Sequence, residues 1–394
     1  MTGSPLRWAA LNLCCIGQPG LRRRLMARGV EAGGAPPLPP PVAESTGSTP
    51  RPGRSWDEAA REELERARRF GAGVLTLEDA SYPRLLLVSS DPPPLLYVWG
   101  RLAPEDALAI AMVGSRRATP HGVEVARRIA SGLAVAGFTV VSGLARGIDA
   151  ASHRGALEAG GRTLAFLGSG LNRIYPAEHL KLAAAIAGRG AVLSEFPFGT
   201  PPLKRHFPER NRAIAWIAWA TIVVEAARDS GSLITAGLAA DEGRTVYAVP
   251  GPVGAPGAEG TNALLREGAL VCRDASDVLE DLAPQLVEAA RQIAEARRGA
   301  EAEVPGAART AEDGRRDGAA GSAAAADDAS SHTAGLTPDE TLVLRHLPAR
   351  GGIGIEGLGR ACGLPPGRLL ATLLELELRG LVRQLPGRRF MSSG

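Results

Sequence analysis

Cysteine and histidine, which serve redox, disulfide and many metal sites, are scarce in this chain. The 394 residues include four cysteines, and no two of them have C-x-x-C spacing. A disulfide framework is implausible at this length, so the cysteines indicate a reducing, cytoplasmic environment. A metal site needs clustered His, Cys or carboxylate side chains, whereas four of the histidines are scattered: His121, His153, His179 and His206. We therefore expect no bound metal and no cofactor.

Lysine is almost absent, because Lys181 and Lys204 are the only two. The formal net charge is nevertheless +3, so arginine carries nearly all of the positive charge. A planar guanidinium group suits bidentate recognition of phosphate. This mildly basic balance is compatible with a local basic surface but does not require one.

Long hydrophobic runs are also missing. No uninterrupted apolar stretch reaches the length of a transmembrane helix. The N-terminus lacks the basic segment, apolar run and small-residue cleavage site of a secretion signal. We expect a cytoplasmic protein without a membrane partner.

Two segments of biased composition divide the chain. Residues 33–53 are rich in proline and predict a flexible insertion, and residues from about 297 to 334 have a composition typical of disorder. Helices are expected within 7–30 and from Trp56 to Phe70. The predicted divisions are a small helical region at 1–70, a core at 71–290, a disordered linker at 291–334 and a C-terminal domain at 335–394.

The central block alternates between short apolar segments and amphipathic ones. The expected helices include residues 123–137 and 233–243. Segments rich in Val, Ile and Leu without polar alternation are typical of parallel strands buried on both faces. The spacing suits right-handed βαβ crossovers and predicts an α/β fold, a Rossmann-like doubly wound sheet that is mostly parallel. Its strands are expected at 108–114, 138–143, 163–168, 191–195, 221–225, 245–251 and, more weakly, 269–272.

The C-terminal domain has the outline of a winged helix. Thr337 begins a capping box with proline at the first helical position. Helices are expected over 355–362 and 366–379, followed by a hairpin. The longer helix is mostly apolar and acidic, so the domain could instead bind protein or stabilise a dimer. In a nucleic-acid role its phosphate contacts would be Arg368, Arg383, Arg388 and Arg389.

Features that favour anions gather in the loops after the strands. In an open parallel sheet, ligands bind beyond the carboxyl ends of the strands. These loops combine small residues, helix N-termini and arginines, which attract anions. Each loop alone could be a simple turn, but several share one edge. We predict an anion-binding edge with the basic residues Arg116, Arg146, Arg173, Lys204, Arg205, Arg210, Arg212 and Arg228.

Common catalytic motifs are missing. GSGLNR at 168–173 ends in arginine where the dinucleotide fingerprint needs glycine, and neither a P-loop nor a G-x-S-x-G elbow occurs. Glu225 is the one carboxylate that could act as a general acid or base. Its simpler role is to hydrogen-bond neighbouring loops. A nucleotide-processing enzyme resembling the phosphoribohydrolases is the alternative function, although their G-G-x-G-T-x-x-E type motif is not found here.

The segment at 196–208 combines phenylalanine with basic residues. Single-stranded nucleic acid needs a basic groove and aromatic faces on which bases stack. Lys204, Arg205 and His206 supply the basic groups, and the prolines at 197, 201, 202 and 208 would hold the segment extended. The rings could instead anchor a long loop onto the core, and we expect at least one to do so: Phe196, Phe198 and Phe207.

The loop motifs resemble the DNA processing protein A family (DprA, also called Smf). The resemblance runs in order from about Tyr82 to Leu282 and includes MVGSRRATPHG, VVSGLARGIDAASHRGAL, GSGLNRIYPAEH, LSEFPFGTPPLKRHFPERNRAIA, VVEAARDSGSLITAGLA and VYAVPGPVGAPGAEGTNALLREGA. More loosely, the N-terminal helices resemble the family's small helical domain, of the SAM or helix-hairpin-helix kind. The C-terminal domain resembles its winged helix.

The resemblance implies a non-enzymatic protein that binds single-stranded DNA. It also implies a homodimer that loads a RecA-type recombinase onto incoming DNA during natural transformation. The DNA-contacting positions carried over to this sequence are Ser115, Arg116, Gly143, Arg146, Gly147, Lys204, Arg210, Asn211, Ser230, Gly231, Ser232 and Thr235.

Overall fold

A computed structural model describes residues 5–26, 55–282 and 336–392, with short gaps in the first and last ranges at 16–17, 19–20, 23, 349–351, 365–368, 370–371, 374–375, 377–380 and 386–388. The chain divides into two compact units, Met1–Glu280 and Asp281–Gly394. The proline-rich insertion predicted at 33–53 and the linker predicted at 291–334 lie outside the described residues. Among the described residues, no helix is both long and apolar enough to cross a membrane.

The first unit is built on a nine-stranded mixed sheet in the order β1-β2-β6-β5-β4-β3-β7-β8-β9. Along the sheet, every strand from β6 through β3 to β9 is parallel to its neighbours in this group. Strand β2 pairs antiparallel with both β1 and β6. Their bounds are β1 Gly73–Thr76, β2 Leu95–Gly100, β3 Ala109–Val113, β4 Thr139–Ser142, β5 Thr163–Phe166, β6 Ala191–Ser194, β7 Ala220–Val223, β8 Thr245–Ala248 and β9 Leu270–Val271.

The seven strands expected from the sequence form the parallel part, which confirms the fold class. Strands β1 and β2 were not predicted. They join the sheet as an antiparallel pair, so no βαβ spacing marks them, and three consecutive prolines obscure the segment before β2.

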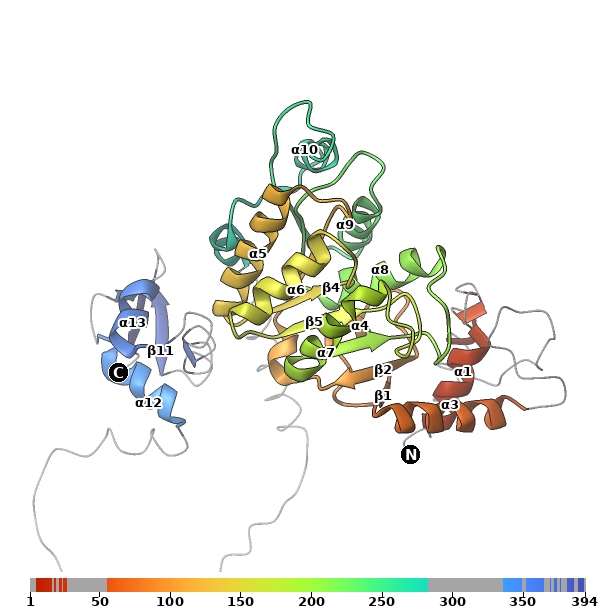
Figure 1. The fold of residues 1–394 in the computed structure, drawn as a ribbon. Coiled ribbons are helices and arrows are strands. Elements are labelled where there is room, and N and C mark those ends of the chain that lie inside the picture. Colours follow the sequence, from red (N-terminus) through yellow and green to blue (C-terminus); the bar gives the residue numbers. More distant parts are fainter. Residues whose placement is uncertain are drawn as a thin grey trace, which may run out of the picture. The chain divides into compact units, whose positions relative to one another are not determined.

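Helices cover both faces of this sheet (Figure 1). Helix α5 begins after Thr119, whose hydroxyl accepts the Gly122 amide at 3.0 Å. The helices of this unit include α1 Pro5–Cys15, α3 Trp56–Phe70, α4 Arg84–Leu87, α5 Pro120–Val135, α6 Ile148–Glu158, α7 Leu180–Arg189, α8 His206–Ile217, α9 Gly231–Asp241 and α10 Glu259–Arg266, with short 3-10 turns at Pro104–Ala107 and Ala177–His179.

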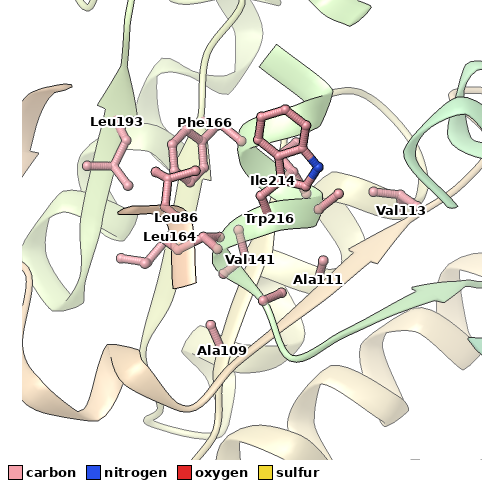
Figure 2. Close-up of a cluster of buried hydrophobic side chains, with 14 of the residues drawn as sticks. Leu86, Ala109, Ala111, Val113, Val141, Leu164, Phe166, Leu193, Ile214 and Trp216 are labelled. Carbon is pink, nitrogen blue, oxygen red and sulfur yellow. The ribbon is translucent and has the colours of Figure 1, made fainter. Parts of the chain in front are cut away.

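Successive residues of a strand enter different hydrophobic clusters. Leu164 and Phe166 of β5 pack in the cluster that contains α8 residues such as Trp216 (Figure 2). The intervening Ala165 packs in the other cluster, which includes residues of α1, α3 and α7. Side chains alternate between the faces of a strand, so burial on both faces explains why the strands are apolar throughout.

A buried cluster of four charged side chains ties the N-terminal helical segment to the core. Arg22 donates from Nε to Asp91 Oδ1 at 2.9 Å and lies 3.3 Å from Glu195 Oε2. Arg212 of α8 binds the same two acids. All four side chains are at least nine-tenths buried, so each charge depends on its partners for stabilisation.

The second unit carries the elements of the winged helix. They are α12 Pro338–His346, β10 Ile353–Gly354, α13 Ile355–Cys362, β11 Val382–Leu385 and β12 Arg389–Ser392, and the three strands form a sheet in the order β10-β12-β11. The capping box at Thr337 and the hairpin are confirmed. Residues 369, 372, 373 and 376 of the longer expected helix are helical. Arg368, Arg388 and the Arg389 side chain lie outside the described part of the chain.

The charged cluster leads to a prediction about stability. The Arg22→Ala substitution should lower the free energy of unfolding by about 3 kcal/mol, because it leaves buried carboxylates short of a partner. Denaturant unfolding of the full chain measures the change. Arg7→Ala on α1 is the matched control, since Arg7 is exposed, and it should change stability by less than about 0.5 kcal/mol. Equal effects of the two substitutions would contradict the assignment.

Candidate nucleic-acid interface

The candidate site lies where the strand order reverses. From β3 the chain builds the sheet outward through β4, β5 and β6 on one side, and through β7, β8 and β9 on the other. The loops after β3 and β7 therefore diverge and leave a crevice at the carboxyl edge, which is the usual ligand position in such sheets. A groove of about 900 Å³ occupies this position and is lined by both loops and by residues of α8.

Nine of the twelve residues expected from the family resemblance line this groove: Ser115, Arg116, Lys204, Arg210, Asn211, Ser230, Gly231, Ser232 and Thr235. They come from three segments that are far apart in the sequence. The structure thus brings most of the expected residues together, while the remaining three, Gly143, Arg146 and Gly147, are not part of the lining.

Gly143 and Gly147 allow neighbouring segments of the protein to approach closely. Gly143 is buried, and a Cβ there would collide with the guanidinium group of Arg210. Gly147 has a φ of +73°, and a Cβ there would collide with the backbone carbonyl of Ser115. Their surroundings thus require glycine at both positions for packing within the protein.

Arg210 lies buried at the floor of the groove. Its Nη1 donates to the carbonyl oxygens of Gly143 and Phe166, the latter at 2.7 Å. Burial lowers the pKa of Arg210 to about 10; Asp149 opposes this shift and Arg116 adds to it. The guanidinium therefore stays charged at neutral pH.

Asp149 joins this floor from the first turn of α6. Its Oδ2 accepts the amides of Gly143 at 3.2 Å and Ala145 at 3.3 Å. Burial raises the pKa of Asp149, against the opposing effects of Arg210, the two amides and Arg116. The carboxylate thus folds the turn after β4 back onto α6.

The exposed charges of the groove are mostly positive. Arg116, Arg117 and Lys204 are exposed members of the lining, and Asp229 is its one exposed acid. The N-terminus of α9 also opens here, where the Ser230 hydroxyl accepts the Ser232 amide at 3.3 Å. A helix N-terminus adds partial positive charge, so the groove suits an anion.

Only one phenylalanine of the 196–208 segment reaches the groove. Phe207 lines it, with the Arg116 guanidinium 4.8 Å from the ring centroid. Phe196 stacks on His206 inside the core, and Phe198 packs edge-on against Tyr97. The expectation that this segment would be extended is wrong from residue 206 onward, because α8 begins there.

The other basic residues expected at this edge have different surroundings. Arg212 is buried in the charged cluster with Asp91 and Glu195. Arg146 is exposed beside the groove and donates from Nε to Glu178 Oε1 at 2.5 Å. The three remaining arginines are exposed but do not line the groove: Arg173, Arg205 and Arg228.

Glu225 holds loops together, in agreement with its simpler predicted role. Its Oε2 accepts the amide of Thr119 at 2.9 Å, and its carboxylate lies so close to Gly122 and Gly257 that neither position has room for a Cβ. Glu225 does not line the groove.

Among the lining residues that were not predicted are a cation and an aromatic ring, Arg117 and Tyr175. Arg117 follows the predicted Arg116 in the GSRR turn, so its charge could have identified it as a site residue. Tyr175 lies in the loop after β5, and nothing in its local pattern distinguishes it from a core residue.

The packing of Gly143 leads to a second prediction. The Gly143→Ala substitution should lower the free energy of unfolding by about 2 kcal/mol, because the added methyl group displaces the Arg210 guanidinium. Gly231→Ala is the control, since no atom lies within 4 Å of a Cβ placed there, and it should have an effect below about 0.5 kcal/mol. Thermal unfolding compares the two variants. A Gly143→Ala variant as stable as the control would refute the assignment.

Known protein families match both the core and the C-terminal domain of this chain. The family model of DNA recombination-mediator protein A matches residues 73–283, and a model of the DprA winged helix domain matches residues 325–388. Protein Smf of Escherichia coli strain K12 is 43% identical over 210 residues, which cover 53% of this chain and 56% of that protein. The matched region thus spans little more than half of that relative.

Two other matches cover more of this chain. A DNA processing protein DprA of Mycobacterium tuberculosis strain H37Rv is 35% identical over 367 residues, covering 90% of this chain and 84% of that protein. The X-ray structure of DNA processing protein A from Streptococcus pneumoniae superposes with a TM-score of 0.59 at 32% identity, covering 71% of this chain and 98% of that one. The chain belongs to the DNA recombination-mediator protein A family.

Proposed function

We propose that this chain binds single-stranded DNA in the groove between the loops after β3 and β7. The main observation behind this proposal is that Arg116, Arg117 and Lys204 are exposed around one groove that also contains aromatic rings. Positive charge attracts the phosphates of the strand, and aromatic faces stack on unpaired bases. A duplex offers the phosphates but keeps its bases stacked on one another.

The residues expected from the family resemblance divide into two kinds in this proposal. Arg116 and Lys204 contact phosphate oxygens, together with the polar groups at the N-terminus of α9, from Ser230 to Ser232. Asn211 and Thr235 offer further hydrogen-bonding groups in the lining. Arg210 in the lining, and Gly143 and Gly147 next to it, hold the loops in place. Arg146 is exposed beside the groove.

We propose that the bound strand serves as the substrate onto which a recombinase is loaded. Membership of a recombination-mediator family supports a protein that binds DNA, acts without catalysis and delivers the strand to a RecA-type recombinase as a homodimer. The groove itself supports the absence of catalysis. Its one exposed carboxylate, Asp229, lies among cations, and within the described part of the chain no hydrogen bond orients it as a general base.

The binding proposal predicts a measurable salt dependence. Arg116→Ala should weaken binding of a fluorescently labelled oligo-dT by about tenfold at low salt, because one charge-assisted contact is lost. The slope of log K against log salt should become shallower by about 0.7, the value for one phosphate of a single strand. Fluorescence anisotropy over a salt series measures both quantities.

A matched control comes from an arginine far from the groove. The Arg68 side chain is 76% exposed on α3, so Arg68→Ala changes the net charge equally and should leave both affinity and slope unchanged. A binding constant of the wild-type chain that does not respond to salt would overturn the proposal. So would an Arg116→Ala variant that binds like the control.

The loading proposal predicts an effect on recombinase assembly. The wild-type chain and the Arg68→Ala variant should shorten the lag before a RecA-type recombinase begins DNA-dependent ATP hydrolysis on single-stranded DNA. The Arg116→Ala variant should shorten it less at the same concentration, because fewer strands carry the protein. An unchanged lag with the wild-type chain would argue against loading, while leaving DNA binding intact.

A further inference from the structure

We infer that Tyr175 is the open aromatic face of the groove and stacks on an unpaired base of the bound strand. This inference rests on the proposed function and adds a residue that selects for the bases, in addition to those that attract phosphate. It depends on how the two aromatic rings of the described lining, Tyr175 and Phe207, are surrounded.

Phe207 is already in contact with protein cations. The guanidinium carbons of Arg116 and Arg210 lie 4.8 Å and 5.8 Å from its ring centroid, and the residue is half-buried. These distances are within the range of cation–π attraction. A base that stacked on Phe207 would have to compete with guanidinium groups, one of which, Arg210, is fixed in the floor of the groove.

Tyr175 is the more accessible of the two rings. It is 43% exposed, which is high for a large aromatic residue in a concave site. Its ring centroid lies 5.8 Å from that of Phe207, with an interplanar angle of 51°, so Phe207 supports it without covering it. An exposed, supported ring in a basic groove is what a stacked base needs.

The loop that carries Tyr175 is held by its own hydrogen bonds. The Arg173 amide donates to Gly170 O at 2.8 Å, and the Ser169 hydroxyl donates to Arg173 O at 2.6 Å. Asn172 Oδ1 accepts the Gly199 amide at 2.7 Å. Because the loop is ordered before any ligand arrives, stacking on Tyr175 costs little conformational entropy.

Arg146 is the cation near the Tyr175 ring that can bind the phosphate next to the stacked base. Arg146 is exposed and bonded to Glu178, and its raised pKa arises first from Glu178 and to a smaller extent from Tyr175, which places the phenol near the guanidinium. The exposed ion pair is weak in water, so a phosphate can replace Glu178. Tyr175 and Arg146 together fit one nucleotide, a base and its phosphate.

The test compares two oligonucleotides of equal length and charge. One is an oligo-dT of about 15 nucleotides, and the other consists of abasic units that keep the phosphates and lack the bases. Tyr175→Ala should weaken binding of oligo-dT by about five- to one-hundred-fold, the usual range for losing one stacking face. It should change binding of the abasic strand by less than about twofold. Tyr175→Phe should bind both strands like the wild type, because the ring remains.

Two controls separate the possible outcomes. Arg116→Ala should weaken binding of both strands, since it acts on phosphate. Val135→Ala removes exposed apolar surface at the C-terminal end of α5 and should affect neither. Equal weakening of both strands by Tyr175→Ala, or no weakening of either, would overturn the stacking role while the proposed function stands. A wild-type chain that binds neither strand would overturn the proposed function and the stacking role with it.

Discussion

The groove depends on one buried cation, the Arg210 guanidinium. It reaches from α8 to the carbonyl oxygens of Phe166 at the end of β5 and of Gly143 just after β4. A buried charge costs several kcal/mol unless its surroundings pair it, and here two carbonyls and the nearby Asp149 do so. The same contacts hold the ends of two neighbouring strands at fixed positions relative to α8, so the floor of the groove is set before any ligand binds.

This arrangement separates structural charge from binding charge. Arg210 and Asp149 compensate each other below the surface, so the attraction for an anion comes from the exposed Arg116, Arg117 and Lys204. Long-range attraction by exposed charges is screened by salt, whereas a buried pair is screened much less. The fold can therefore keep its stability over a range of salt concentrations in which phosphate binding changes steeply.

Helix α8 uses two arginines for two different tasks. Arg210 and Arg212 are two positions apart, about 200° around a helix, and they reach different partners. Arg210 supports the groove, and Arg212 joins Arg22 in the charged cluster that fastens the N-terminal helical segment. One helix thus links the groove to the N-terminal part of this unit. The sequence alone treated both arginines as anion contacts, because the partner that buries each one is distant along the chain.

Local patterns in the sequence determined the parallel strands, the cap at Thr337, and the order of the loops at one sheet edge. Each depends on neighbouring residues and on the burial period of its element. Only the tertiary structure determined which arginines remain exposed and which close contacts require glycine at 143 and 147. It also determined that Tyr175 enters the groove while Phe196 and Phe198 do not. Burial and pairing of a side chain depend on residues brought close only by folding, so no local pattern could reveal them.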